Sequence, residues 1–69
     1  MTLEEYRRKF VWSVGEMARK ASIDYSTMKR ALEGENISAR TARAITEMLT
    51  KETGKPIHIQ DIEGLNVNL

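Results

Sequence analysis

Residues 13–34 read SVGEMARKASIDYSTMKRALEG, and this stretch decides the predicted fold. Ser13 precedes Glu16 by three residues, the spacing of a capping box, in which two side chains satisfy free backbone N–H groups at a helix start. Asp24 holds the same place ahead of YSTMKRALE. Only residues 21–23 remain between the two segments, which leaves room for a sharp reversal. The stretch is therefore predicted to form two short helices separated by a tight turn.

The flanking sequence predicts two further helices. Thr2 and Glu5 form a second capping box for a helix ending near Trp12, and Ser38 begins a fourth helix that ends before Gly54. Apolar residues recur every three or four positions in all four segments, as on the buried face of a helix. The residues expected in the core are Leu3, Tyr6, Phe10, Val14, Met17, Ala18, Ala21, Met28, Ala31, Leu32, Ala42, Ile45, Met48 and Leu49.

The last segment, residues 57–69, is ambiguous. Its β-branched residues favour a strand, whereas HIQDIEG (58–64) reads as one short helical turn closed by glycine. We expect a short fifth helix over residues 59–63 that covers the core, and a frayed or partner-bound tail over about 65–69. Core closure and a dimer interface are equally favoured uses of the tail's apolar residues, which are Leu65, Val67 and Leu69.

Composition and charge indicate the class of protein. The 69 residues are enough for one domain with one small core, and the absence of cysteine excludes a disulfide scaffold or a thiolate metal site. No stretch approaches the roughly 20 apolar residues of a membrane span or resembles a signal peptide, so we expect a cytoplasmic protein. Residues 1–45 carry nine Lys and Arg against six Asp and Glu, whereas residues 46–69 carry two against four. This weak basic bias permits binding to DNA without proving it.

The third predicted helix carries the candidate chemistry on its outer face. With Met28 buried, Tyr25 and Lys29 share the exposed side with Ser26 and Arg30. Arg can donate two hydrogen bonds to guanine, Ser can donate or accept, and Tyr can contact phosphate or a thymine methyl group. These groups suit a DNA major groove, although solvated surface charges are the simpler explanation for the two cations taken alone.

A family resemblance covers about two-thirds of the chain. The residues that carry it are Ser13, Glu16, Met17, Ala18, Lys20, Ala21, Ile23, Ser26, Thr27, Met28, Arg30 and Gly34. Through these residues the chain resembles the Cro/phage-repressor (XRE-like) helix-turn-helix family, and the similarity extends to Leu49. The resemblance implies an all-α, compact four- to five-helix lambda-repressor-like domain spanning residues 1–69, with a helix-turn-helix at about 13–34 and a recognition helix at 24–33.

The resemblance also implies a set of DNA-contacting residues. The residues at the positions where the family reads bases are Tyr25, Ser26 and Arg30. The residues that flank them are Thr27 and Lys29. Arg40 matches a position that contacts the DNA backbone.

Three residues depart from the family pattern. Val14 stands where the family often has a phosphate-binding Gln, and Ser22 stands where it usually has Gly, so Ser22 must tolerate or avoid a left-handed backbone. Leu32 replaces a frequent Glu that pairs with an Arg of the first helix. Arg7 is therefore expected to lack a partner and to be free for solvent or phosphate.

Other kinds of chemistry find little support in the sequence. His58 is the single histidine, so no set of metal ligands is expected, and it is interpreted as a surface or capping residue. Asp61 and Glu63 point in different directions on a helix, and no serine has a neighbouring base to activate it. We expect no enzyme, no cofactor, no metal site and no small-molecule substrate.

Two functions remain after these exclusions. The first is a sequence-specific transcriptional regulator, such as a repressor, that binds double-stranded DNA as a homodimer on a palindromic operator. The second is a protein-interaction module on the same fold, antitoxin-like or a complex subunit, with weak or no specific DNA binding.

Overall fold

The computed structural model describes residues 1–68, so the expectation for Leu69 lies outside the described part of the chain. The elements and their bounds are α1 Leu3–Phe10, α2 Val14–Ala21, α3 Tyr25–Leu32, β1 Ile37–Ser38, α4 Ala39–Thr53, a 3₁₀ helix η1 Ile59–Asp61, and β2 Val67–Asn68.

Each predicted helix start is confirmed. Thr2, Ser13, Asp24 and Ser38 are the N-caps, and each side chain accepts a hydrogen bond from the backbone N–H three residues later. Both predicted capping boxes, at α1 and α2, are complete. These bonds satisfy backbone donors that have no partner within the helix, so the polar residues determine where each helix begins.

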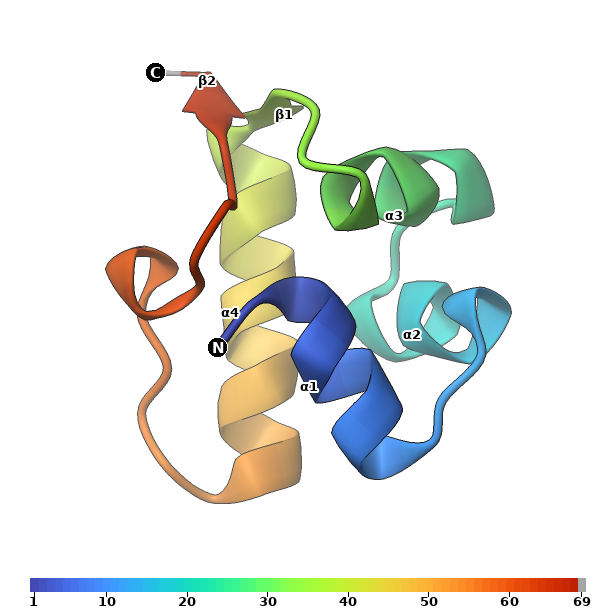
Figure 1. Ribbon diagram of the computed structural model, residues 1–69, viewed down its shortest axis with the longest axis vertical. Helices are drawn as coiled ribbons and strands as arrows, with labels where there is room; N and C mark the ends of the chain where they lie inside the picture. The colour runs from blue at the N-terminus through green and yellow to red at the C-terminus, as the bar shows by residue number, and fades with distance from the viewer. Residues whose placement is uncertain (69) are drawn as a thin grey trace.

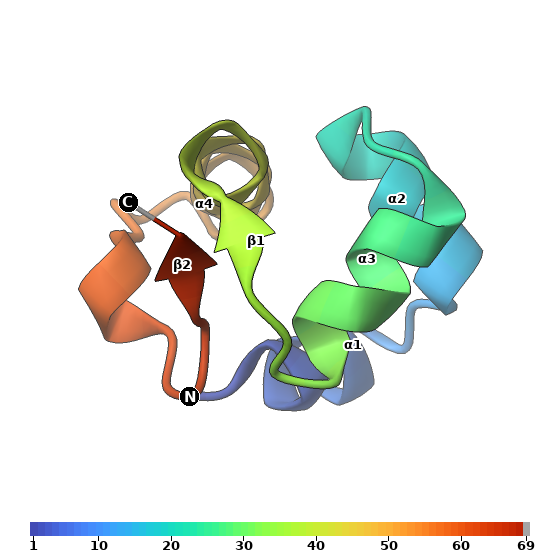
Figure 2. The ribbon, with the colours of Figure 1, turned by 90° about the horizontal axis from the view of Figure 1, so that it is seen from above.

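Helix α4 lies between the other elements of the fold. In Figure 1, α4 runs along the longest axis of the molecule, with α2 and α3 on one side and the C-terminal segment on the other. Figure 2, seen from above, shows β1 and α4 between β2 on one side and the α2–α3 pair on the other. Helix α3 contacts α1, α2 and β1. This packing of its inner side holds its exposed face in place.

The core matches the predicted apolar faces closely. Met17, Met28, Ile45 and Leu49 are fully buried, and most of the other expected core residues are buried as well. The expected core residues that pack against it only partly buried are Phe10, Val14 and Leu32. The buried apolar residues outside that expected set are Trp12, Ile37 and Ile62.

The expectation of a compact helical domain is confirmed in part, because the structure adds a small parallel sheet that an all-α fold does not include. Ile37 of β1 pairs with Val67 of β2, and the Ile37 N–H donates to the Asn66 carbonyl at 2.9 Å. Ile37 is buried and Val67 packs half-buried against the core. The protein is therefore a compact, mostly helical domain of four helices with a two-stranded parallel sheet.

The C-terminal segment closes the core, so the expectation of a frayed tail is wrong for residues 65–68. The expected helix over residues 59–63 is a shorter 3₁₀ turn, Ile59–Asp61, because Ile62 already has extended backbone. Ile62 is only 3% exposed, which gives this turn the covering role that was predicted. The His58 N–H donates to Asp61 at 2.9 Å, so His58 occupies the predicted capping position.

Candidate functional site

The turn between α2 and α3 consists of residues 22–24. Ser22 adopts the left-handed backbone, with φ of 58°, so it tolerates the conformation for which the family pattern has Gly. Its N–H donates to the Arg19 carbonyl at 3.1 Å, and the Ile23 N–H donates to the Ala18 carbonyl at 3.0 Å. This pair of bonds is a Schellman motif, which satisfies the last carbonyls of α2. Ile23 packs against the core, and the next residue, Asp24, caps α3.

The outer face of α3 is exposed over its whole length. Met28 and Ala31 lie in the core, whereas Tyr25 is 56% exposed and its neighbours on the outer face are also exposed. An α-helix with its side chains is about 10–12 Å across, which fits the roughly 12 Å width of a DNA major groove. The exposed residues of this face are Tyr25, Ser26, Lys29 and Arg30.

Asp24 holds two hydroxyl groups that the sequence reasoning treated as free. Ser26 Oγ donates to Asp24 Oδ2 at 2.7 Å, and Thr27 Oγ1 donates to Asp24 Oδ1 at 2.6 Å. The hydrogen bonds from Thr27 and then Ser26 lower the pKa of Asp24 to about 2. Both hydroxyl protons are therefore engaged, and either group would contact a ligand as an acceptor unless Asp24 releases it. The pattern Asp-x-Ser-Thr at a helix start was the signal for this cluster.

The two cations of α3 differ in their surroundings. Arg30 forms an ion pair with Glu35, with 3.5 Å between Nε and Oε1, and both side chains remain more than half exposed. Lys29 is in no ion pair within residues 1–68. Because Asp24, Glu33 and Glu35 flank these two cations, residues 24–35 are slightly acidic. The local charge of α3 therefore gives little attraction for a polyanion.

Arg40 lies apart from α3 in the sequence but follows the same loop. It is exposed in the first turn of α4, whose start is capped by Ser38. Strand β1, which precedes α4 directly, contacts both α3 and α4. In Figure 2, β1 lies between α3 and the start of α4, and the α3–β1 loop and β1 connect the two helices. Two helices on either side of β1 therefore each carry an exposed arginine.

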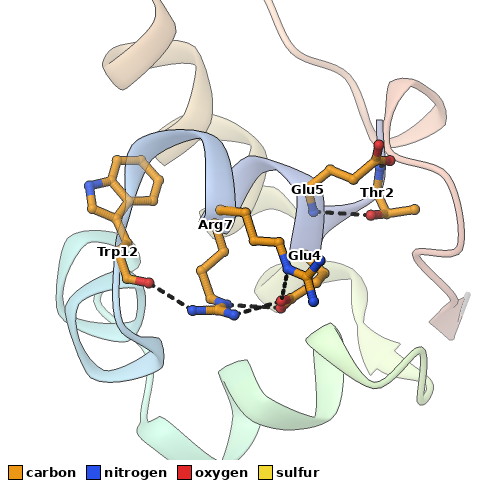
Figure 3. Close-up of polar contacts among 6 residues, drawn as sticks. Thr2, Glu4, Glu5, Arg7 and Trp12 are labelled. Carbon is orange, nitrogen blue, oxygen red and sulfur yellow. Dashed lines mark hydrogen bonds and ion pairs between the residues drawn. The ribbon is translucent and has the colours of Figure 1, made fainter.

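Arg7 is not free, which corrects the expectation drawn from the family pattern. Its Nη2 and Nε contact the two carboxylate oxygens of Glu4 at 2.6 and 2.8 Å, and its Nη1 donates to the Trp12 carbonyl at 3.0 Å (Figure 3). The hydrogen bond from Arg7 is the main cause that lowers the pKa of Glu4 to about 2, and Arg8 adds to it. A local carboxylate three residues earlier thus replaces the missing partner in α3.

Other surface features do not gather catalytic groups. A groove of about 430 Å³ between α1 and the end of α4 has a mixed lining of apolar side chains and the polar residues Lys9, Glu52, Thr53 and Lys55. A second groove of about 400 Å³ lies between α2 and α4. Within residues 1–68, no three His, Cys, Asp or Glu residues are grouped so that they could hold a metal ion. No helix in this range is both long and apolar enough to cross a membrane.

Comparison of the chain with family models, with curated proteins and with solved structures finds no match in any of the three. The functional assignment therefore depends on the residues and their geometry.

Proposed function

We propose that this protein is a sequence-specific, DNA-binding transcriptional regulator of the helix-turn-helix type that acts in the cytoplasm. In this proposal α2 supports α3, and residues 24–33 enter the major groove as the recognition helix. Tyr25, Ser26 and Arg30 face the bases, Thr27 and Lys29 flank them, and Arg40 contacts the DNA backbone.

The observation that carries the proposal is the exposed polar face of a short, doubly anchored helix. The Schellman turn at Ser22 and the cap at Asp24 fix the start of α3, and Met28 fixes its buried face. Side chains on such a rigid helix present their hydrogen-bonding groups in a defined direction, as direct readout of bases requires. Phosphate contacts would position the helix in the groove.

Size argues for a homodimer on a palindromic operator. A single small module buries only roughly 600–1,000 Å² on DNA, and a second copy doubles the contacts. The Cα atoms span 26 × 23 × 18 Å, so two copies side by side can place their α3 helices about 34 Å apart, one turn of DNA. Two α3 helices can therefore enter successive major grooves.

The first test is selection of binding sites from a random DNA duplex library, with native mass spectrometry of the selected complex. We expect enrichment of one sequence with two-fold symmetry and a mass corresponding to two chains on one duplex. Failure to enrich any sequence would contradict the proposal.

Arginine variants then separate base reading from backbone contact. On the selected site, Arg30→Ala should cost about 1–3 kcal/mol and relax specificity at one base pair of each half-site, because a bidentate contact is lost. Arg40→Ala should weaken binding to all sequences and reduce the salt dependence. Lys55→Ala is the control, since it removes the same charge beyond the end of α4. Equal, salt-insensitive losses in both arginine variants would refute the assigned roles.

The acidic residues around α3 support a second candidate, a protein-interaction module. Glu33 and Glu35 would repel phosphate but could meet basic groups of a partner protein. An antitoxin-like protein or a complex subunit would use the same surface in this way. The random-duplex selection distinguishes the two, because this candidate enriches no sequence.

A further inference from the structure

The loop after α3 brings Glu35 back to Arg30. The Glu35 N–H donates to the Arg30 carbonyl at 3.0 Å, and the Gly34 N–H donates to the Ala31 carbonyl at 3.2 Å. Gly34 has φ of 82°, a left-handed backbone that reverses the chain at the helix end. This Schellman motif sets the backbone of residue 35 against that of residue 30. The pairing of their side chains, 3.5 Å from Arg30 Nε to Glu35 Oε1, follows from it.

The C-terminal segment fixes this loop in place. Asn66 Nδ2 donates to the Gly34 carbonyl at 2.6 Å, and the Asn66 carbonyl accepts from the Ile37 N–H at 2.9 Å. The two bonds hold the loop on both sides of Glu35. A carboxylate in such a loop loses less conformational freedom when it pairs than one on a mobile loop would.

We propose that Glu35 is a positioning residue that orients Arg30 for recognition of guanine. The inference rests on the proposed DNA-binding function. A guanidinium group has five N–H donors, and the ion pair at Nε leaves the four on the two Nη atoms available. Guanine presents two adjacent acceptors in the major groove, O6 and N7, which two guanidinium donors contact together. Glu35 thus holds one edge of the guanidinium while the other edge meets the base.

The negative charge of Glu35 has two opposite effects on DNA binding: it orients Arg30, and it repels phosphates. Between exposed side chains the pair is weak, and it strengthens when DNA displaces water around it. The same carboxylate repels phosphates from any sequence. Positioning predicts that Glu35 raises the preference for one base, whereas repulsion alone predicts that it lowers affinity for every duplex alike.

The experiment compares Glu35→Gln with Glu33→Gln, which removes the same charge two residues earlier and has no ion pair within residues 1–68. Fluorescence anisotropy measures each affinity for the selected operator and for operators with the other base pairs at the position that Arg30 reads. We expect Glu35→Gln to reduce discrimination at that position about threefold, the effect of losing an exposed ion pair. Glu33→Gln should leave discrimination unchanged, and in an Arg30→Ala background Glu35→Gln should have no further effect on it.

The outcomes separate this inference from the function on which it rests. Unchanged discrimination with uniformly tighter binding in Glu35→Gln would overturn the positioning role and leave DNA binding intact. A wild-type chain that selects no sequence would overturn both. Circular dichroism melting of each variant shows whether a loss of discrimination coincides with a loss of fold.

Discussion

Replacing Val11 with glycine should stabilise the protein. Val11 follows α1 with φ of 57° and ψ of 42°, a left-handed conformation that costs a residue with a Cβ roughly 1–2 kcal/mol and is least favourable for β-branched side chains. Its side chain is 86% exposed, so little buried apolar area is lost on truncation. Glycine relieves this strain, but it also gives the unfolded chain more conformational entropy, which lowers the stability of the fold by about 0.4–1 kcal/mol. The net expectation is a gain of about 0.5–1 kcal/mol.

Thermal unfolding followed by circular dichroism measures this gain. For a domain of this size, 1 kcal/mol corresponds to roughly 4–8 °C in Tm. Val14→Gly is the matched control, because Val14 lies in the first turn of α2 and packs half-buried against the core. That variant should lower Tm. If Val11→Gly also lowers Tm, the left-handed backbone at residue 11 is not a net cost, and the strain argument fails.

Two other changes test the local polar contacts. The pKa of Glu4 lies at about 2 instead of its ordinary 4.5, so its contacts with Arg7 stabilise the fold above about pH 4.5, and this stabilisation is lost as pH falls toward 2. Glu4→Gln should therefore flatten the dependence of Tm on pH below 4.5, and an unchanged slope would exclude Glu4 as its source. Asn66→Ala removes the hydrogen bond to the Gly34 carbonyl and should cost about 1 kcal/mol. Hydrogen exchange should also become faster at the Ile37 amide, and unaltered exchange there would show that the loop does not depend on the tail.

The helix starts could be predicted because their causes are local. Each cap joins a side chain to a backbone N–H three residues away, as Ser13 does with Glu16 and Ser38 does with Thr41. The spacing of buried residues within α4 is likewise a property of one helix. Sequence alone therefore predicted the starts of all four helices and most of the core.

The parallel sheet could not be predicted because its cause is not local. Its strands, Ile37–Ser38 and Val67–Asn68, are only two residues long and lie on opposite sides of α4 in the sequence. Two residues are too few to show the alternation of apolar and polar side chains that is typical of a strand. Their pairing depends on where α4 and η1 place the C-terminal segment in the fold. The contact between Asn66 and Gly34 spans the same separation. Such contacts become visible only after the chain has been assembled in three dimensions.

The sequence-based expectations for two polar groups overlooked a neighbouring carboxylate. Arg7 was expected to be free because Leu32 stands where the family has Glu, although Glu4 lies within reach on the same helix. Ser26 was expected to have a free hydroxyl because it points outward, although the carboxylate of Asp24 lies two residues earlier and accepts its hydrogen bond. In both cases a carboxylate within one helical turn determines what the polar group can still bind.

The shape of the helix pair alone does not identify the proposed DNA-binding surface, because the turn before α2 has the same geometry as the turn before α3. Val11 and Ser22 have nearly equal backbone angles, and each is followed by an apolar residue and an N-cap, Trp12–Ser13 in one case and Ile23–Asp24 in the other. The first turn leads into α2, which buries three of its eight residues and ties Lys20 to Glu52 of α4. The second leads into α3, whose outer face remains open. The assignment of α3 as the recognition helix therefore depends on its exposed side chains, and Arg30 with its partner Glu35 is where that assignment can be tested most directly.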